Sequence, residues 1–270
     1  MKLALQLFSV RDDMDKDFLG TLKAVKAMGY EGGELAGLYG RTASEVKQAF
    51  EEAGLTPISA HVAYQDLMVN IEDVVKTYYE IGCKYIAIPY LTEDYRYGSE
   101  KYNDVVKNIA IIGETCKKYG IVLLYHNHDF EFAKTEEGVY VLDKLYRDVP
   151  ADLLQTEIDT CWVNVAGENP SDYVRKYTGR APVVHLKDFV GSKSENMYKL
   201  IGIESEEAES SSAFEFRPLG YGKQDVKSLI DAASDAGASW IVAEQDEPSM
   251  GKTRLECAEM SISYLKKIGY

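Results

Sequence analysis

The stretch KKYGIVLLYHNH, residues 117–128, contains the pattern that decides the fold. A helical segment ends at a glycine, and an apolar run follows directly and finishes with two histidines. Glycine readily takes the left-handed conformation that ends a helix, and a short apolar run is typical of a strand covered on both faces. The same order recurs in KAMGYEGGEL, EEAGLTPISAH, EIGCKYIAIPY and DAGASWIVAEQ, at residues 26–35, 51–61, 80–90 and 235–245. Five copies indicate repeated β–α units.

Extended along the chain, this pattern predicts a barrel. We predict strands at about residues 3–8, 31–36, 57–62, 84–90, 121–127, 153–159, 182–187 and 240–245. Amphipathic helical stretches lie between them, and Asn70 and Ser99 are the predicted N-caps of two of these helices. Eight such units in 270 residues predict an α/β fold, a single (β/α)₈ TIM barrel over residues 1–270. The alternative, a doubly wound open sheet, lacks its usual GxGxxG motif after the first strand.

One segment interrupts the alternation. Residues 190–217 are acidic and rich in serine, and they follow the seventh predicted strand. Long loops after barrel strands lie on the face where barrel enzymes carry their active sites. We expect an inserted, partly mobile loop over that face, with a solvated insertion of no functional role as the alternative.

The overall composition restricts the class of partner. The net charge of −14 and the pI near 4.8 argue against binding to nucleic acid or to an anionic membrane. The sequence contains neither a signal peptide nor an apolar stretch of membrane-spanning length, so we expect a cytoplasmic protein. The four cysteines are widely spaced without a CxxC motif, which predicts reduced, mostly buried thiols.

Polar residues stand at the carboxyl ends of the predicted strands. They are Gln6, Ser9, Glu34, His61, His126, Asn127, His128, Glu157, Asp159, His185, Lys187, Asp188, Glu244, Gln245 and Asp246. All four histidines of the chain belong to this set. Because parallel strand ends converge on one face of a closed barrel, we expect these side chains to meet there.

Each of these residues alone has a structural explanation, such as a hydrogen-bonded core histidine or, for Asp159 and Asp246, a helix cap. The set as a whole is harder to explain in this way, because every unpaired buried charge costs several kcal/mol. A divalent cation removes that cost by neutralising carboxylates and ordering imidazoles. Mixed oxygen and nitrogen ligands suit manganese, cobalt, zinc, iron or magnesium. We therefore predict one divalent metal ion at this face.

A family resemblance rests on seven phrases that occur in order along nearly the whole chain. They are LALQLFSVRDD, GYEGGELAGLYG, YHNHDFEF, EIDTCWVNVAGENP, VVHLKDF, RPLGYGKQDV and VAEQDEP. With them the chain resembles the xylose-isomerase-like TIM-barrel superfamily of sugar isomerases and epimerases, which includes inosose isomerases and dehydratases. The resemblance implies a divalent metal and a small carbohydrate substrate, and barrels of this kind often form homodimers.

The resemblance also implies a ligand set. In the epimerases of this superfamily a Glu, an Asp, a His and a second Glu hold the metal, and Asp159, His185 and Glu244 match the last three. His126 stands in the place of the first Glu, which puts the two-glutamate epimerase mechanism in doubt and brings the chain closer to members that resemble inosose dehydratase. We take His126 as the fourth ligand and His128 as a contact of substrate or of a metal-bound water, although these two assignments can be exchanged.

The expected chemistry is proton transfer next to the carbonyl of a keto-sugar or related polyol, through a metal-stabilised enediolate. Glu244 is the first candidate for the base and His128 the second. Lys187 is predicted to be an electrostatic partner or acid, with a surface lysine paired to Asp188 as the alternative. The predicted substrate contacts are Glu34, His61, Arg217 and Trp162.

Several reactions and classes remain open at the level of sequence. An enediolate can lead to isomerisation, to epimerisation or to loss of water, as in an inosose-type dehydratase. A non-catalytic sugar-binding barrel would keep the pocket without the chemistry. A DNA hydrolase similar to endonuclease IV shares the fold, but it needs three metals and many more histidine ligands than four.

Overall fold

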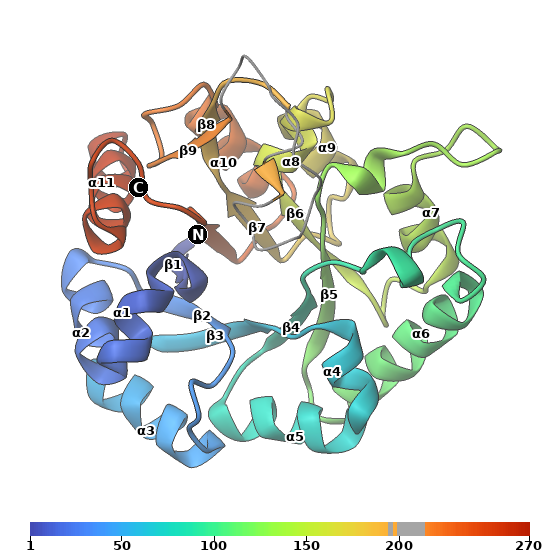
Figure 1. Ribbon diagram of the computed structural model, residues 1–270, viewed down its shortest axis with the longest axis horizontal. Coiled ribbons are helices and arrows are strands. Elements are labelled where there is room, and N and C mark those ends of the chain that lie inside the picture. The colour runs from blue at the N-terminus through green and yellow to red at the C-terminus, as the bar shows by residue number, and fades with distance from the viewer. Residues whose placement is uncertain (194–196, 199–213) are drawn as a thin grey trace.

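The computed structural model describes residues 1–193, 197–198 and 214–270. Eight parallel strands close into a barrel in the order β1-β10-β7-β6-β5-β4-β3-β2 (Figure 1). They are β1 (Lys2–Gln6), β2 (Gly32–Ala36), β3 (Thr56–His61), β4 (Tyr85–Ile88), β5 (Val122–His126), β6 (Gln155–Asp159), β7 (Val183–Leu186) and β10 (Trp240–Ala243). The predicted single (β/α)₈ barrel is confirmed. β1 closes it, because Leu5 pairs with Gly33 on one side and with Ala243 on the other.

Helices surround the barrel. They are α1 (Arg11–Lys16), α2 (Phe18–Met28), α3 (Ala43–Ala53), α4 (Tyr64–Val69), α5 (Ile71–Ile81), α6 (Tyr102–Lys118), α7 (Val141–Asp148), α8 (Thr160–Val165), α9 (Pro170–Lys176), α10 (Val226–Asp235) and α11 (Arg254–Lys267), with short 3₁₀ turns η1 (Leu7–Val10), η2 (Glu93–Tyr95) and η3 (Phe130–Phe132). Gly29, Gly54 and Gly82 end α2, α3 and α5 with positive φ angles of 113°, 67° and 105°. The glycine pattern of the sequence therefore does mark helix ends.

One of the two predicted N-caps is correct. Asn70 caps α5, because its side chain accepts a hydrogen bond from the backbone N–H of Asp73. The prediction for Ser99 is wrong: α6 begins only at Tyr102, and Lys101 occupies the N-cap position without a side-chain bond. The chain makes another turn first, in which the N–H of Tyr102 donates to the carbonyl of Ser99 at 3.3 Å.

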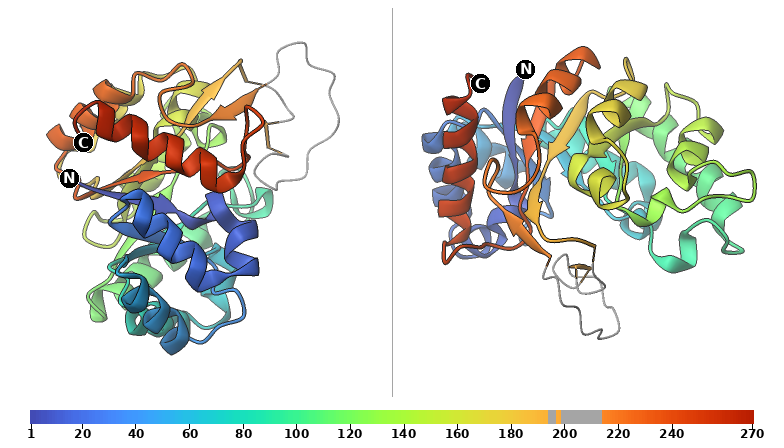
Figure 2. Two further views of the ribbon diagram at one scale, coloured as in Figure 1. Left: turned by 90° about the vertical axis from the view of Figure 1, so that its left-hand side faces the viewer. Right: turned by 90° about the horizontal axis from the view of Figure 1, so that it is seen from above.

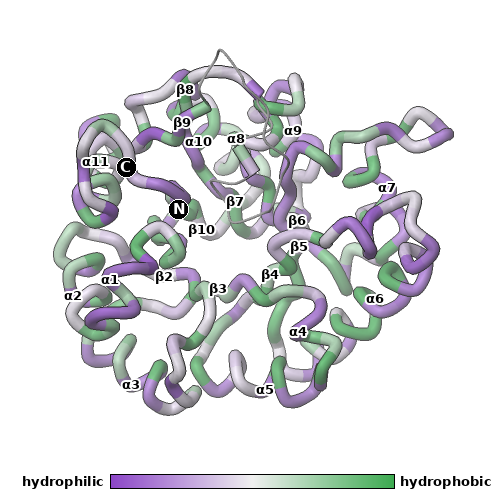
Figure 3. The backbone as a smooth tube through the Cα atoms, viewed as in Figure 1, coloured by the Kyte–Doolittle hydropathy of each residue, from purple (hydrophilic) through white to green (hydrophobic). Residues whose placement is uncertain are grey.

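The apolar core has two parts. One fills the lower lumen of the barrel with Ala4, Ile58, Ala87, Leu124, Val183, Trp240 and Val242. The larger part lies between the strands and the helices, whose hydrophobic and hydrophilic residues alternate along each coil (Figure 3). The four cysteines are buried and unpaired, as predicted. In the described ranges, every helix is too short or too polar to cross a membrane.

A small antiparallel ribbon follows β7. β8 (Asp188–Val190) pairs with β9 (Glu215–Arg217), at the end of the barrel opposite to the two chain termini (Figure 2). The ribbon and its nearest residues are the described parts of the predicted loop at 190–217. Residues 194–196 and 199–213 lie outside the described residues, so a loop over the active site stays a prediction.

Candidate metal centre and active site

The carboxyl ends of four neighbouring strands supply the site. His126 is the last residue of β5 and Asp159 is the last residue of β6. His185 lies in β7, opposite Asp159 in the ladder, and Glu244 directly follows β10. Because side chains alternate across a strand, a single register places one residue from each of these strands in the lumen.

Four side chains, His126, Asp159, His185 and Glu244, form what we call the outer cluster. The Nε2 atom of His126 lies 3.3 Å from Oδ2 of Asp159 and 3.7 Å from Oε2 of Glu244. The Nδ1 atom of His185 lies 3.0 Å from the same Glu244 oxygen. One ligand atom from each residue lies within 4.8 Å of the others, and all four residues are buried. The structure thus brings the four predicted ligands together.

The outer cluster fits a divalent cation. His126 Nε2 and Asp159 Oδ2 are buried and have no hydrogen-bond partner in the part of the chain that the structure describes. The Nδ1 atom of His126 lies 3.2 Å from the carbonyl oxygen of Pro89. In the neutral ring, that contact places the proton on Nδ1 and leaves the Nε2 lone pair facing the cluster. Buried polar atoms rarely lack partners, and a mixed nitrogen and oxygen set suits a first-row divalent metal.

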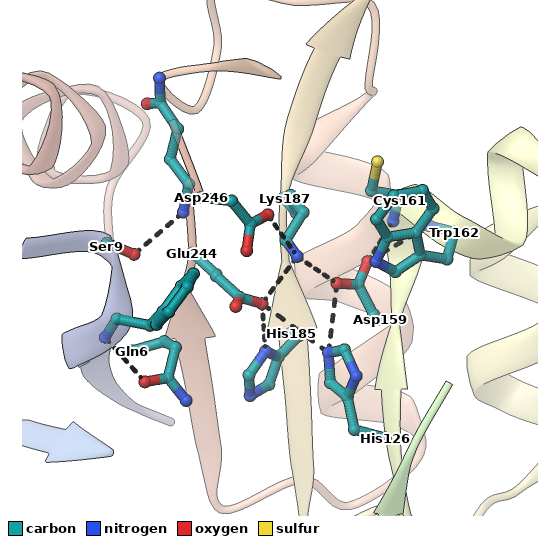
Figure 4. A network of polar contacts seen from close by, with 12 residues as sticks. Gln6, Ser9, His126, Asp159, Cys161, Trp162, His185, Lys187, Glu244 and Asp246 are labelled. Atoms are coloured by element: carbon teal, nitrogen blue, oxygen red, sulfur yellow. Dashed lines mark hydrogen bonds and ion pairs between the residues drawn. The ribbon is translucent and has the colours of Figure 1, made fainter. Parts of the chain in front are cut away.

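Lys187 is a buried cation beside the outer cluster, 1% exposed (Figure 4). Its Nζ atom lies 3.2 Å from Asp159 Oδ2, 3.0 Å from Glu244 Oε2 and 2.9 Å from Asp246 Oδ2. Burial opposes the charged form, but the carboxylates of Asp246, Glu244 and Asp159 outweigh it and hold the pKa of Lys187 well above its usual value. The alternative of a surface lysine paired with Asp188 is therefore wrong.

An excess of negative charge surrounds this cation. Burial disfavours the charged form of His126, yet Asp159 and Glu244 prevail and raise its pKa to about 9. Burial raises the pKa of Asp246 to about 6, against the opposing effect of Lys187. Asp246 is one of the polar residues at strand ends, and sequence analysis gives it only a structural explanation, that of a helix cap. Its contact with the Lys187 ammonium adds it to the site.

A second group, which we call the inner cluster, lies one step deeper in the barrel. It consists of Glu34, His61, Glu157 and His185. The Nε2 atom of His61 lies 2.7 Å from Oε2 of Glu157 and 3.4 Å from Oε2 of Glu34. The Nε2 atom of His185 lies 2.7 Å from the Glu34 oxygen and 3.5 Å from the Glu157 oxygen. Sequence analysis assigns no role to Glu157, although its spacing of two residues from Asp159 places both on one face of β6.

His128 is enclosed by aromatic rings. Its ring stacks on Phe130 at 5.2 Å and lies 5.0 Å from the ring of Trp162. Its Nδ1 atom is buried and makes no hydrogen bond to any described residue. Burial, followed by the nearby charges of His126 and Lys187, holds the pKa of His128 well below its usual value. A neutral imidazole with a free nitrogen can accept a proton.

A cavity of about 380 Å³ gives access to the site. Of the predicted site residues, its lining includes His61, His126, His128, Lys187 and Glu244, together with Asp246. Glu34, Asp159, His185 and Trp162 are buried around it. Arg217 lies on β9 and pairs with Glu215, and it is absent from the described lining of the cavity. The contacts of Arg217 and Trp162 with substrate stay predictions.

Known proteins are similar over nearly the whole chain. An inosose dehydratase from Clostridium botulinum is 23% identical, over 95% of this chain and 93% of its own. A crystal structure of a sugar phosphate isomerase/epimerase from Parabacteroides distasonis superposes with a TM-score of 0.76 at 21% identity, over 98% of both chains. The IolI protein, solved with a bound zinc atom, gives 0.70 at 15% identity, over 99% of this chain and 98% of that one. At these identities the structural matches show the fold.

One further match, to a family model, covers most of the chain and identifies the family. The family model of the xylose isomerase-like TIM barrel matches residues 22–268. This range includes both clusters and every barrel strand except β1. The chain therefore belongs to the xylose isomerase-like TIM-barrel family.

Proposed function

We propose that the protein is a divalent-metal-dependent isomerase or epimerase of a keto-sugar or related polyol. The observation that carries the proposal is the outer cluster, whose four buried ligand atoms lie within 4.8 Å of one another beside a cavity of about 380 Å³. A pocket with convergent polar groups and shifted pKa values is the usual setting of an enzyme active site. Relatives named as sugar phosphate isomerase/epimerase and inosose dehydratase support a carbohydrate substrate. The buried free cysteines agree with a cytoplasmic location.

The protein groups in this proposal have separate tasks. His126, Asp159, His185 and Glu244 would hold the metal, which, when bound, polarises the substrate carbonyl and stabilises the enediolate. The ammonium of Lys187 lines the cavity and carries positive charge to the oxygen on which negative charge develops. The closely packed rings of Trp162 and Phe130 around His128 restrict the access of water to the reacting carbon.

We assign removal of the proton to His128. The Oε2 atom of Glu244 is engaged, because it lies 3.0 Å from both His185 Nδ1 and Lys187 Nζ. The Nδ1 atom of His128 has no hydrogen-bond partner among the described residues, and the side chain lines the cavity. This geometry favours His128 over Glu244, the first candidate from sequence.

Loss of water from the substrate is the second candidate reaction, that of an inosose-type dehydratase. Two observations favour it. Relatives with that name match 95% of this chain, and the outer cluster contains an imidazole, His126, where the two-glutamate epimerases have a carboxylate. Lys187 would then protonate the departing hydroxyl group.

Exchange in deuterated water tests the proposal. Wild-type protein with manganese or cobalt should incorporate deuterium at the carbon beside the carbonyl in a panel of keto-sugars and inososes. Asp159→Asn should lose the metal of the outer cluster together with exchange. His128→Gln should keep that metal and lose at least 100-fold in exchange rate, within the range of one general base. Asp172→Asn on the exposed side of α9 is the matched control. If Asp159→Asn exchanged deuterium at the wild-type rate, the reaction would not take place at the outer cluster. Formation of an unsaturated product identifies the dehydratase.

A further inference from the structure

We propose that the inner cluster is a second divalent-cation site, formed by Glu34, His61, Glu157 and His185. Its two carboxylates and two imidazoles suit a zinc-type ion in a four-coordinate site. Three of these residues are absent from the outer cluster, so the second site can exist even if the proposed reaction is wrong. Four observations support it.

The first observation is the spacing of the ligand atoms. A tetrahedral ion with ligands at roughly 2.0–2.1 Å requires its ligand atoms to lie about 3.3 Å apart. The contacts of Glu34 Oε2 with His61 and of Glu157 Oε2 with His185 measure 3.4 and 3.5 Å. The two remaining contacts, both 2.7 Å, need to open by only about 0.6 Å to reach that spacing. These four contacts are thus near the spacing that an ion requires, and Glu34 Oε2 is also held in place by a hydrogen bond from Gln6 Nε2 at 2.8 Å.

The second observation is a set of buried atoms without partners. Glu34 Oε1, Glu157 Oε1 and His185 Nε2 make no hydrogen bond to the described part of the chain, and all three residues are 0% exposed. His185 Nε2 lies within 3.5 Å of two carboxylate oxygens. This nitrogen is therefore in ion-pair range of both carboxylates, where a cation could take the place of its proton. An unpartnered group costs free energy in this position, and a cation would remove that cost.

The third observation is the balance of charge in the lumen. Five buried carboxylates face it, those of Glu34, Glu157, Asp159, Glu244 and Asp246, against the single ammonium of Lys187. Imidazolium groups can offset part of this negative charge in the metal-free chain. Two divalent ions together with Lys187 would balance all five carboxylates. Burying uncompensated charge is the costlier arrangement.

The fourth observation is that His185 can serve both clusters without losing a proton. Its Nδ1 atom lies 3.0 Å from Glu244 Oε2 with hydrogen-bond geometry. A neutral ring that donates its Nδ1–H to Glu244 has its lone pair on Nε2, which faces Glu34 and Glu157. When both sites are filled, His185 would bind the inner ion and orient Glu244, and the outer ion would keep His126, Asp159 and Glu244 as its three protein ligands.

The inner cluster also has a route of entry and a closed floor. The side chain of His61 is 12% exposed and lines the cavity, so an ion can enter past it. Below the cluster, the apolar plug of the lower lumen excludes water and further polar ligands. An ion in this position would therefore exchange slowly through a single opening.

Metal counting on the intact protein tests the proposal. After dialysis against micromolar free zinc, the wild-type chain should retain close to two ions. Glu157→Gln should retain one, Asp159→Asn should also retain one, and the double variant should retain close to none. Glu247→Gln removes the same charge from a partly exposed side chain paired with Arg11 and Arg254, and it should retain two ions.

Anomalous scattering at the zinc edge from wild-type crystals gives a test that needs no variant. We expect two peaks, one of them bounded by Glu34, His61 and Glu157. One ion per wild-type chain, or a map with no peak in the inner cluster, would overturn the second site. It would leave the outer site and the proposed reaction intact, because those depend on Asp159 and His128.

Discussion

The ammonium of Lys187 competes with a metal ion for two carboxylates of the outer cluster. Its ammonium lies within 3.2 Å of Asp159 and Glu244, which are both in the outer cluster. A fixed positive charge so close to two metal ligands weakens cation binding by repulsion. The same charge is well placed to stabilise negative charge on a substrate oxygen. The charge of Lys187 therefore lowers the affinity of the outer cluster for metal while it favours the proposed reaction.

Lys187→Met separates the two effects. We expect zinc to bind about tenfold more tightly, since removal of one charge near a partly screened site changes the binding free energy by more than 1 kcal/mol. Turnover should fall by at least 100-fold. Competition with a chelating dye measures the first effect and deuterium exchange measures the second. Lys223→Met, on the exposed side of the ribbon, is the control. Weaker zinc binding in Lys187→Met would contradict the claim that the Lys187 ammonium competes with the metal ion.

Glu131 predicts a pH dependence of stability. It is 5% exposed, accepts hydrogen bonds from the Tyr125 hydroxyl and the His128 backbone N–H, and burial raises its pKa to about 7. A carboxyl whose pKa is raised on folding stabilises the fold fully below its unfolded pKa, near 4.5. That contribution is lost as pH rises through about 7.

Glu131→Gln should remove this dependence, because an amide has no proton to lose. Between pH 5 and pH 8, urea unfolding of the wild type should lose up to about 3 kcal/mol relative to the variant. The same comparison with Glu136→Gln, an exposed neighbour, should show no such difference. Parallel pH profiles for wild type and Glu131→Gln would rule out the shifted carboxyl as the cause.

Some of the site was predictable from residue positions and some was not. Asp159, His185 and Glu244 stand at strand ends after apolar runs, so closure of the barrel was enough to place them together. Glu157 and Asp246 were missed as site residues because their roles depend on contacts across the lumen, with His61 and with Lys187. Such contacts depend on side-chain rotamers, which spacing along one strand does not fix.

Among the elements, the β8–β9 ribbon depends on one side chain. The carboxylate of Asp188 accepts backbone N–H groups from Phe189, Gly220, Gly222 and Gln224. A Cβ added at Gly222 would lie 2.1 Å from an Asp188 oxygen, so the turn fits closely around this carboxylate. The ribbon in turn packs Phe216 and Phe189 against Trp162, in the wall around Lys187.

Asp188→Ala should therefore loosen the ribbon. Loss of hydrogen bonds to a buried charged acceptor should cost about 2–4 kcal/mol of unfolding free energy, and proteolytic cleavage near residues 214–224 should become faster. Asp231→Ala, at an exposed position of α10, should do neither. Chemical denaturation and limited proteolysis with mass spectrometry provide the measurements. If cleavage stays at the wild-type rate, the carboxylate does not hold the turn.

At the scale of the whole molecule, the outer cluster links four barrel strands, β5, β6, β7 and β10, through one candidate ion site. A ligand that binds only the folded chain stabilises the fold by mass action. Metal should therefore act on the stability of the entire barrel, as well as on the chemistry at one end of it.

Chelation should lower the melting temperature of the whole chain. At free metal 100-fold above the dissociation constant, binding contributes about 2.7 kcal/mol, which corresponds to roughly 5–10 °C for a domain of this size. Calorimetry with and without a chelator measures the shift. The double variant of Glu157→Gln and Asp159→Asn, which lacks a ligand in each cluster, should melt at the same temperature in both conditions. A wild-type melting temperature unaffected by chelator would show that metal does not hold these strands together.

The pairing of β1 with β10 has a consequence for how the chain is made. Lys2–Gln6 precedes Trp240–Ala243 by nearly the whole barrel, so during synthesis β1 has an unpaired side until β10 is made. Glu34, His61 and Glu157 emerge long before Glu244. During translation the inner residues are therefore made before β10, but their positions in the barrel become fixed only when β10 pairs with β1 and β7.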